Sequence, residues 1–174
     1  MNIVQYPDPR LRKKNAPVTD FGPELEAKVR EMFEVMYATQ GVGLAAPQVG
    51  WNVLLLVYNP TGKPEEKDQE MVLCNPKLVF KSRDKEDGTE GCLSFPDVSG
   101  VVNRPLKVKV EAQDLKGEKC ELELEGWDAR IFQHELDHLD GILFIDRMTP
   151  ASKSQAKPVL EDLVHVYKES LAGS

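Results

Sequence analysis

The feature that most constrains this chain is the pair His134 and His138, which lies in the sequence HELDH and accounts for two of only three histidines in 174 residues. Apolar side chains recur at three- and four-residue steps over 127–139, which predicts an amphipathic helix. Residues four apart on a helix share one face, with Cβ atoms about 5–6 Å apart, so both imidazoles can reach one cation. Glu135 lies roughly 100° around the axis, where its carboxylate can take a proton from a water on that cation. The competing interpretation is an amphipathic helix end with exposed polar residues.

The length and composition fit one domain over 1–174, with a C-terminal helix or tail over about 150–174. A chain near this length buries roughly two-thirds of the surface of its unfolded state, enough for a sizeable core. The net charge of −7 argues against a broad basic face for nucleic acid. Three cysteines without a secretion signal argue against a disulfide framework.

The sequence predicts a cytoplasmic protein without a membrane partner. It contains no apolar run near the roughly 20 residues that a membrane span needs. Its first residues lack the patterns of signal and transit peptides, although removal of a targeting peptide would leave the same sequence.

The hydrophobic pattern places a helix first, then several strands, then a helix that carries the two histidines. This order favours an α+β fold, with antiparallel sheets packed around a central helix carrying the HExxH motif and with N-terminal and C-terminal helices. Residues 41–50 and 83–89 are expected to be loops, and 59–70 an exposed polar excursion without an evident role. The predicted elements are a helix over 23–40, strands over 53–58, 71–74 and 78–81, a hairpin of 107–112 with 120–125, the helix 127–139, a strand over 142–145 and a helix over 150–171.

Two histidines leave a catalytic metal short of the usual three protein ligands. Upstream, Cys92 follows Gly91, which permits close backbone approach, and a thiolate is a strong ligand for a borderline metal. Downstream, Glu161, His165 and Glu169 on the last predicted helix would suit a metallopeptidase, although glutamate and histidine on such a helix are usually solvated. A buried, inert thiol at Cys92 is the remaining alternative.

The glycine-bounded segment GVGLAAPQ, residues 41–48, imitates a dinucleotide-binding fingerprint. It follows a helix rather than a strand, and Pro47 is awkward inside the helix that such a motif opens, so the nucleotide interpretation is rejected. The segment is either a plain connection or an extended stretch whose backbone pairs with a peptide and whose Gln48 amide donates to an oxyanion.

Three motifs together closely resemble the peptide deformylases: GVGLAAPQ at 41–48, EGCLS at 90–94 and QHELDH at 133–138. The family patterns are G-φ-G-φ-A-A-x-Q, E-G-C-φ-S and Q-H-E-x-D-H, in the same order and at similar spacing. Each motif alone is a moderate signal, whereas the three in sequence are specific. The resemblance runs from residues 6–9 to about Met148.

The resemblance implies a hydrolase acting on a linear amide C–N bond, which removes the N-formyl group from N-formylmethionyl nascent peptides and releases formate. It implies one divalent metal, usually Fe²⁺ in the cell, with Ni²⁺, Co²⁺ or Zn²⁺ able to substitute. In the family, a metal-bound water attacks the formyl carbon with a glutamate as general acid/base. The implied roles are metal ligation by Cys92, His134 and His138, acid/base catalysis by Glu135, oxyanion binding by Gln48 and the Leu93 N–H, β-like pairing with substrate by Val42, Gly43 and Gly91, and structural pairing of Glu90 with Arg104.

Two features depart from the family pattern. Arg130 lies where some members place apolar contacts to the methionine pocket, so Ile131 and Leu93 are the expected lining. The tail over 151–174 is balanced in charge and does not resemble the basic ribosome-docking tail of some bacterial members, so ribosome contact is expected to be transient. The alternatives are an HExxH metallopeptidase with a downstream third ligand and a non-catalytic deformylase-like protein that binds N-termini.

Overall fold

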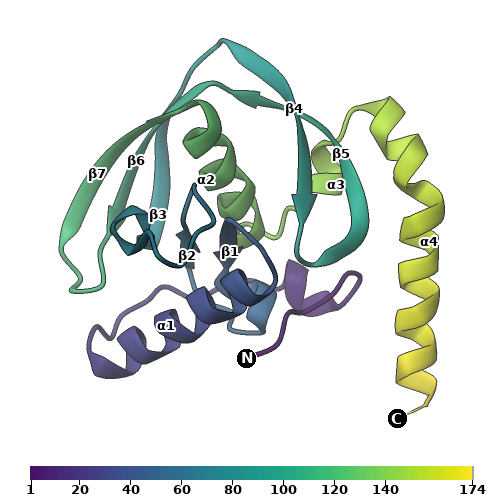
Figure 1. The fold of residues 1–174 in the computed structure, drawn as a ribbon, viewed down its shortest axis with the longest axis horizontal. Helices are drawn as coiled ribbons and strands as arrows, with labels where there is room; N and C mark the ends of the chain where they lie inside the picture. Colours follow the sequence, from purple (N-terminus) through teal and green to yellow (C-terminus); the bar gives the residue numbers. More distant parts are fainter. Residues whose placement is uncertain (174) are drawn as a thin grey trace.

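A computed structural model describes residues 1–173 of the chain (Figure 1). It is a mixed α+β fold with antiparallel sheets, as predicted. The elements in chain order are η1 (Pro9–Arg12), α1 (Pro23–Ala38), β1 (Gly43–Ala45), η2 (Ala46–Val49), β2 (Leu55–Tyr58), η3 (Lys67–Gln69), β3 (Met71–Lys81), β4 (Lys85–Cys92), β5 (Phe95–Pro105), β6 (Lys107–Gln113), β7 (Lys119–Glu125), α2 (Gly126–Leu139), α3 (Phe144–Arg147) and α4 (Pro150–Ala172).

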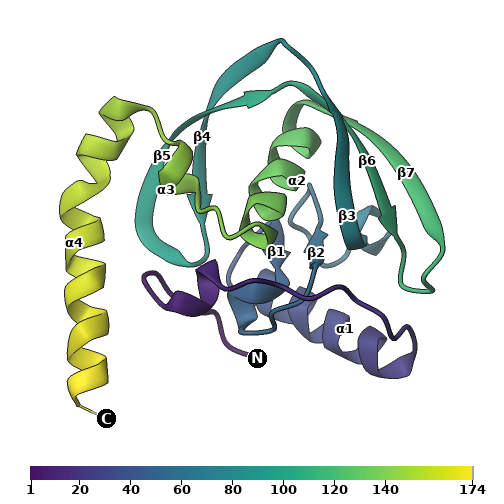
Figure 2. The same cartoon turned by 180° about the vertical axis from the view of Figure 1, so that it is seen from behind.

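Two antiparallel sheets flank helix α2. Five strands pair in the order β1-β2-β3-β6-β7, and β4 pairs only with β5. In Figures 1 and 2 helix α2 lies between the five-stranded sheet and the β4–β5 hairpin, while α1 covers the β1–β2 end of the sheet. The short strand β1 is therefore an edge strand, and its free edge faces the hairpin near α2.

Helix α2 is fixed by apolar packing on two sides. One face packs on the five-stranded sheet, and on the other side the His134 ring lies against the ring of Phe144, which in turn packs on Phe95. Fully burying a side chain of this size contributes about 1.5–3 kcal/mol, so the helix cannot shift without a large loss. Its buried apolar residues are Ala129, Ile131, Phe132 and Leu139, and its buried polar residues are Gln133, His134, Glu135, Asp137 and His138.

Glycines with a left-handed backbone conformation mark both ends of helix α2. Gly126 has φ +61° at the first helical position, and Gly141 has φ +73° just beyond the C-terminus, the usual conformation of a helix stop. A Cβ at Gly141 would lie 3.2 Å from the carbonyl oxygen of Arg12. A side chain at this position would therefore be crowded, and it would also strain the left-handed backbone conformation. The predicted helix over 127–139 is confirmed.

The strand expected over 142–145 is wrong, because residues 144–147 form the short helix α3. The segment is a short apolar run, which the hydrophobic pattern alone cannot assign to strand or helix. Its backbone is turned by a local contact, in which the Leu143 N–H donates to Asp146 Oδ2 at 3.0 Å.

The loops expected over 41–50 and 83–89 contain strands. Residues 83–89 belong largely to β4, whose polar sequence carries no apolar alternation because most of its side chains are exposed. Strand β1 is only three residues long and is fully buried, so it also lacks an alternating pattern.

The two strands expected on either side of Asn75 are one irregular strand, β3. Its residues before Asn75 pair with β2, and its residues from Cys74 onward pair with β6, with register shifts in the β6 pairing between Cys74 and Lys77 and between Leu78 and Phe80. Asn75 adopts φ +51°, and its side chain accepts from the Val18 N–H at 2.8 Å and donates to the Val18 carbonyl at 2.9 Å. These bonds hold the bend and keep the chain in the sheet.

The final helix α4 packs against β5 and continues past the body of the protein in both views. Thr149 caps its N-terminus by accepting from the Ser152 N–H at 3.3 Å. Within residues 1–173, no helix combines the length and the apolar character that crossing a membrane requires.

Candidate metal centre

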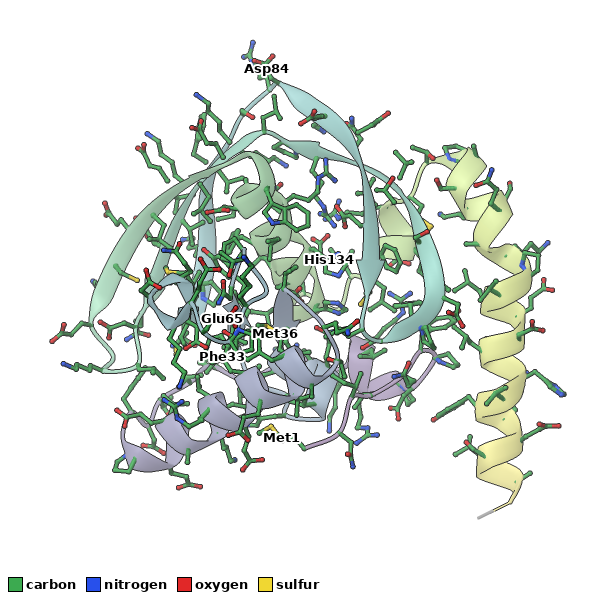
Figure 3. The ribbon with its side chains drawn as sticks, viewed as in Figure 1. Met1, Phe33, Met36, Glu65, Asp84 and His134 are labelled. Atoms are coloured by element: carbon green, nitrogen blue, oxygen red, sulfur yellow. The ribbon has the colours of Figure 1, made fainter. Side chains whose placement is uncertain are left out.

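Cys92, His134 and His138 converge on one point between α2 and the β4–β5 hairpin. Their ligand atoms all lie within 4.8 Å of one another, and Cys92 Sγ is 3.4 Å from His138 Nε2. Figure 3 shows His134 in the space between α2 and β4. One thiolate and two imidazoles form a suitable ligand set for a borderline divalent metal, with room for a further ligand.

The tip of the hairpin delivers Cys92 through an irregular turn. The β4–β5 register shifts between Gly91, which pairs with Ser99, and Cys92, which pairs with Phe95. The N-terminal segment holds the tip of the hairpin in place, because the Tyr6 N–H donates to the Ser94 carbonyl at 2.8 Å. The thiol position is therefore determined by contacts with the N-terminal segment as well as by the strand.

Glu90 is buried and joins His134 to two arginines. Its Oε1 lies 2.8 Å from His134 Nδ1, Arg104 binds both carboxylate oxygens at 2.6 and 2.9 Å, and Arg130 Nη1 donates to Oε2 at 2.7 Å. Burial would raise the pKa of Glu90, but the hydrogen bonds from His134 and Arg104 outweigh it and lower that pKa to about 2. An ionised Glu90 holds the proton of His134 on Nδ1 and leaves Nε2 as the ring nitrogen for a metal.

Asp137 forms a second link on the same helix. Arg104 Nη1 donates to Asp137 Oδ2 at 3.0 Å, and Arg147 binds both of its oxygens at 2.6 and 3.1 Å. Arg104 is therefore a buried cation between two carboxylates, which compensates the cost of removing these charges from water. The pairing expected between Glu90 and Arg104 is present, while Asp137 and Arg147 were not singled out from the sequence.

The two histidines differ electrostatically. For His134, burial lowers the pKa, but hydrogen bonds with Cys92 and Glu90 raise it well above its ordinary value. For His138, burial and the neighbouring charges of His134 and Arg104 all hold the pKa well below its ordinary value. His138 is therefore neutral, the form in which an imidazole binds metal.

Glu135 points between α2 and β1. Burial raises its pKa to about 7, and within residues 1–173 its Oε1 has no hydrogen-bond partner. A Cβ at Gly43 would lie 2.6 Å from Glu135 Oε2, so the absence of a side chain at Gly43 makes room for this carboxylate. A buried carboxyl that titrates near neutrality is suited to proton transfer.

The Gln48 side chain is oriented by bonds at both ends of its amide. Its Oε1 accepts from the Ala45 N–H at 2.9 Å, and its Nε2 donates to Ser94 Oγ at 3.1 Å and lies 3.5 Å from Cys92 Sγ. The amide N–H₂ therefore faces the metal-ligand cluster. Ser94 was not singled out from the sequence as a partner of this amide.

A cleft of about 700 Å³ opens beside the cluster. This volume is several times that of one amino-acid side chain, so the cleft can hold a short peptide segment. It includes Val42, Gly43, Gly91 and Leu93, which were expected to contact substrate, together with Ile131. The cleft also contains Trp127, which sequence reasoning missed, and Arg130, whose guanidinium bonds the carbonyls of Glu86 and Val102.

The downstream ligand candidates do not join the histidine pair. His165 and Glu169 are largely exposed on α4 and pair with each other at 3.1 Å. Glu161 lines a separate cavity between α4 and Tyr6. In Figure 1 helix α4 lies on the far side of the β4–β5 hairpin from α2. The metallopeptidase alternative therefore has no third ligand on α4.

The chain is similar in sequence to proteins that are named peptide deformylases. A relative from Arabidopsis thaliana, Peptide deformylase 1B, chloroplastic/mitochondrial, is 48% identical over 169 residues, which is 97% of this chain and 62% of the relative. A peptide deformylase from Acidobacterium capsulatum is 49% identical over 148 residues, 84% of this chain and 85% of the relative. The chain thus spans less than two thirds of the plant relative but most of the bacterial one.

The fold is also similar to that of solved peptide deformylases. The crystal structure of peptide deformylase from Plasmodium falciparum superposes with a TM-score of 0.95 at 43% identity, covering 97% of this chain and 98% of that one. The sequence profile described as polypeptide deformylase matches residues 1–154. The motifs, the fold and these matches agree, and the chain belongs to the polypeptide deformylase family.

Proposed function

We propose that this chain is a metal-dependent hydrolase that removes the N-formyl group from N-formylmethionyl peptides and releases formate. The observation that carries the proposal is the convergence of Cys92, His134 and His138 beside Glu135, at the edge of a peptide-sized cleft. Family membership supports the same activity. Residues 1–174 would form one catalytic domain.

The residues present fit a divalent metal. Cys92 Sγ and one nitrogen of each histidine would hold it, and Glu90 would orient the His134 ring from behind. When bound, the metal supplies a Lewis acid that polarises a carbonyl and makes water more acidic. We propose Fe²⁺ as the metal in the cell, with Ni²⁺, Co²⁺ or Zn²⁺ able to substitute.

The remaining roles belong to groups of this chain. Glu135 would take a proton from the attacking water and deliver it to the departing amine, a role favoured by its pKa of about 7. The Nε2 amide group of Gln48 and the backbone N–H of Leu93 would donate to the oxygen that gains negative charge. Donors fixed before reaction stabilise such charge without reorganisation.

The edge of β1 would hold the peptide backbone. The Val42 carbonyl is bonded by the Asn59 N–H toward β2, and backbone groups alternate sides along a strand. The N–H and C=O of Gly43 therefore point to the free edge, beside the cleft. An extended peptide would pair with Gly43 on one side and with Gly91 of β4 on the other.

The decisive experiment is formate release from an N-formyl-Met tripeptide, with the protein purified without oxygen and its bound metal assayed in the same tube. We expect turnover with about one metal per chain. Bound metal with no formate would contradict the proposal and favour the non-catalytic N-terminus-binding alternative. Cleavage of a peptide bond in place of the formamide would favour the metallopeptidase alternative.

The partner and location expected from the sequence stay predictions. The substrate implies transient contact with the ribosome, where formylated nascent chains emerge, and no direct binding of nucleic acid is expected. The names of the plant relatives assign them to chloroplasts or mitochondria, whereas this chain is predicted to be cytoplasmic.

A further inference from the structure

The N-terminal segment over residues 4–6 contacts both η2 and the turn of the β4–β5 hairpin (Figures 1 and 2). The Val4 N–H donates to the Gln48 carbonyl at 2.6 Å, and the Tyr6 N–H donates to the Ser94 carbonyl at 2.8 Å. These two bonds join η2, which carries Gln48, to the hairpin turn, which carries Leu93. The segment therefore links the two groups that we propose as donors to the oxyanion.

The side chain of Ser94 connects the same two parts of the protein. Its buried Oγ accepts from Gln48 Nε2 at 3.1 Å, while its carbonyl is held by the Tyr6 N–H. Because Ser94 takes one of the two hydrogens of the Gln48 amide, the other hydrogen remains for a substrate oxygen. The position of Ser94 thus sets the direction of the second N–H, and the neighbouring Leu93 moves with the same turn.

The ring of Tyr6 makes a second contact with the hairpin. It stacks on Phe95, the residue after Ser94, with ring centroids 4.8 Å apart and planes at 21°. Phe95 also packs edge-on against Phe144, with centroids 5.1 Å apart. Phe95 is therefore held by two aromatic rings, and the Tyr6 ring is the one that belongs to the segment bonded to Gln48.

Tyr6 acts on these groups from outside the substrate cleft. It lines the separate cavity beside α4, whereas Gln48, Leu93 and Phe95 line the cleft. An effect of Tyr6 on the reaction must therefore pass through the residues that it holds.

We propose that Tyr6 is a positioning residue for the reaction, which acts through Ser94 and Phe95. By holding these two residues, it keeps the Gln48 amide and the Leu93 N–H at a fixed spacing before substrate binds. The inference rests on the proposed function. Donors that are fixed in advance stabilise developing charge without reorganisation, and a displacement near 1 Å can reduce a rate by about 10²-fold. Loss of the Tyr6 ring therefore lowers kcat rather than the affinity for substrate.

The first test measures kcat, KM and metal content with an N-formyl-Met tripeptide. Tyr6→Ala keeps the backbone N–H but removes the stacked ring, and should lower kcat by about 10- to 100-fold with little change in KM. Tyr6→Phe keeps the ring and should restore most of kcat. Val108→Ala, a buried substitution on β6, is the control and should lower stability without lowering kcat. All variants should keep about one metal per chain.

A double-mutant cycle separates positioning of the donors from a general structural role. In a Gln48→Ala background, Tyr6→Ala should cost about 3- to 10-fold less in kcat than it does in the wild-type background, because residues that act as a unit are not additive. An equal cost in both backgrounds would overturn the inference. So would loss of metal from Tyr6→Ala, failure of Tyr6→Phe to restore kcat, or an equal fall in kcat in Val108→Ala.

Amide hydrogen exchange tests the same inference without turnover. In Tyr6→Ala, peptides that cover residues 46–49 and 92–95 should exchange faster than in the wild-type protein and in Val108→Ala. Unchanged exchange in both regions would overturn the inference, whether formate is released or not. Absence of formate from the metal-loaded wild-type protein would instead overturn the proposed function.

Discussion

Glu90 Oε1 lies 2.8 Å from His134 Nδ1, so a buried carboxylate on β4 sets the orientation of an imidazole on α2. Glu90 and Cys92 are separated on the same strand by Gly91 alone. One strand thus supplies both a proposed metal ligand and the group that orients another. The arrangement links the position of the hairpin to the geometry of the metal site.

Glu90→Gln should weaken metal binding roughly 10- to 100-fold, the usual cost of losing a group that orients a metal ligand. The glutamine keeps the shape of the side chain but removes the charge that Arg104 and Arg130 neutralise. Competition with a chromophoric chelator under anaerobic conditions measures the affinity. Glu86→Gln, an exposed substitution on the same strand, is the control, and equal affinity in the two variants would contradict the prediction.

Cys92→Ala should abolish stoichiometric metal binding, because it leaves only His134 and His138 as ligands. His165→Ala should leave the metal content unchanged, since His165 is exposed on α4 and pairs with Glu169. Metal analysis of both purified variants makes the comparison. The opposite pattern would revive the metallopeptidase alternative.

Glu135→Ala should keep the metal and lose turnover by about 10²-fold or more, because it removes the group proposed to move the proton. Formate release and metal content are measured on the same sample. Undiminished turnover in a metal-loaded variant would show that another group performs the proton transfer.

Gly43→Ala should lower turnover without removing the metal. The new Cβ would lie 2.6 Å from Glu135 Oε2 and 3.0 Å from Ile131 Cγ2, so the carboxylate must move. A displacement near 1 Å can reduce a rate by about 10²-fold. Gly22→Ala, where a Cβ meets nothing within 4 Å, is the matched control. Equal activity in the two variants would mean that Glu135 adapts without loss.

The sequence predicted the metal-ligand cluster better than the fold around it. The spacing of His134 and His138 has one geometric meaning on a helix, and the order of the three motifs is specific to a family. Strand β4 was expected to be a loop because its exposed residues show no apolar alternation, although it carries Cys92 at its end. Backbone pairing with β5, which leaves little trace in composition, creates this strand.

The ion-pair network was only partly predictable. Arg104 was paired with Glu90 through the family resemblance, whereas Arg147 lies ten residues beyond Asp137, across a turn that was assigned to a strand. The hydrogen bond from Trp127 Nε1 to the Pro60 carbonyl joins segments 67 residues apart, and no local pattern connects them. Contacts of this kind depend on the tertiary arrangement and become visible only in the folded structure.

Asp146→Asn should destabilise the protein in a pH-dependent way. Burial would raise the pKa of Asp146, but hydrogen bonds from Arg12 and the Leu143 N–H outweigh it and lower the pKa below the ordinary value of 3.8. A lowered carboxyl pKa stabilises the fold above the unfolded-state value, and the contribution is lost as the pH falls through the folded-state value. The difference in free energy of unfolding between wild type and variant should therefore be constant near neutrality and shrink below about pH 4.

Because Arg12 and Asp146 are 46% and 37% exposed, solvent screening limits the difference to about 0.2–1 kcal/mol. Urea unfolding at several pH values, followed by circular dichroism, measures it. Asp20→Asn, an exposed substitution before α1, is the control and should show a smaller difference. A difference for Asp146→Asn that grows as the pH falls would contradict the sign derived from the lowered pKa, and would mean that the Arg12 pair does not stabilise the ionised carboxyl.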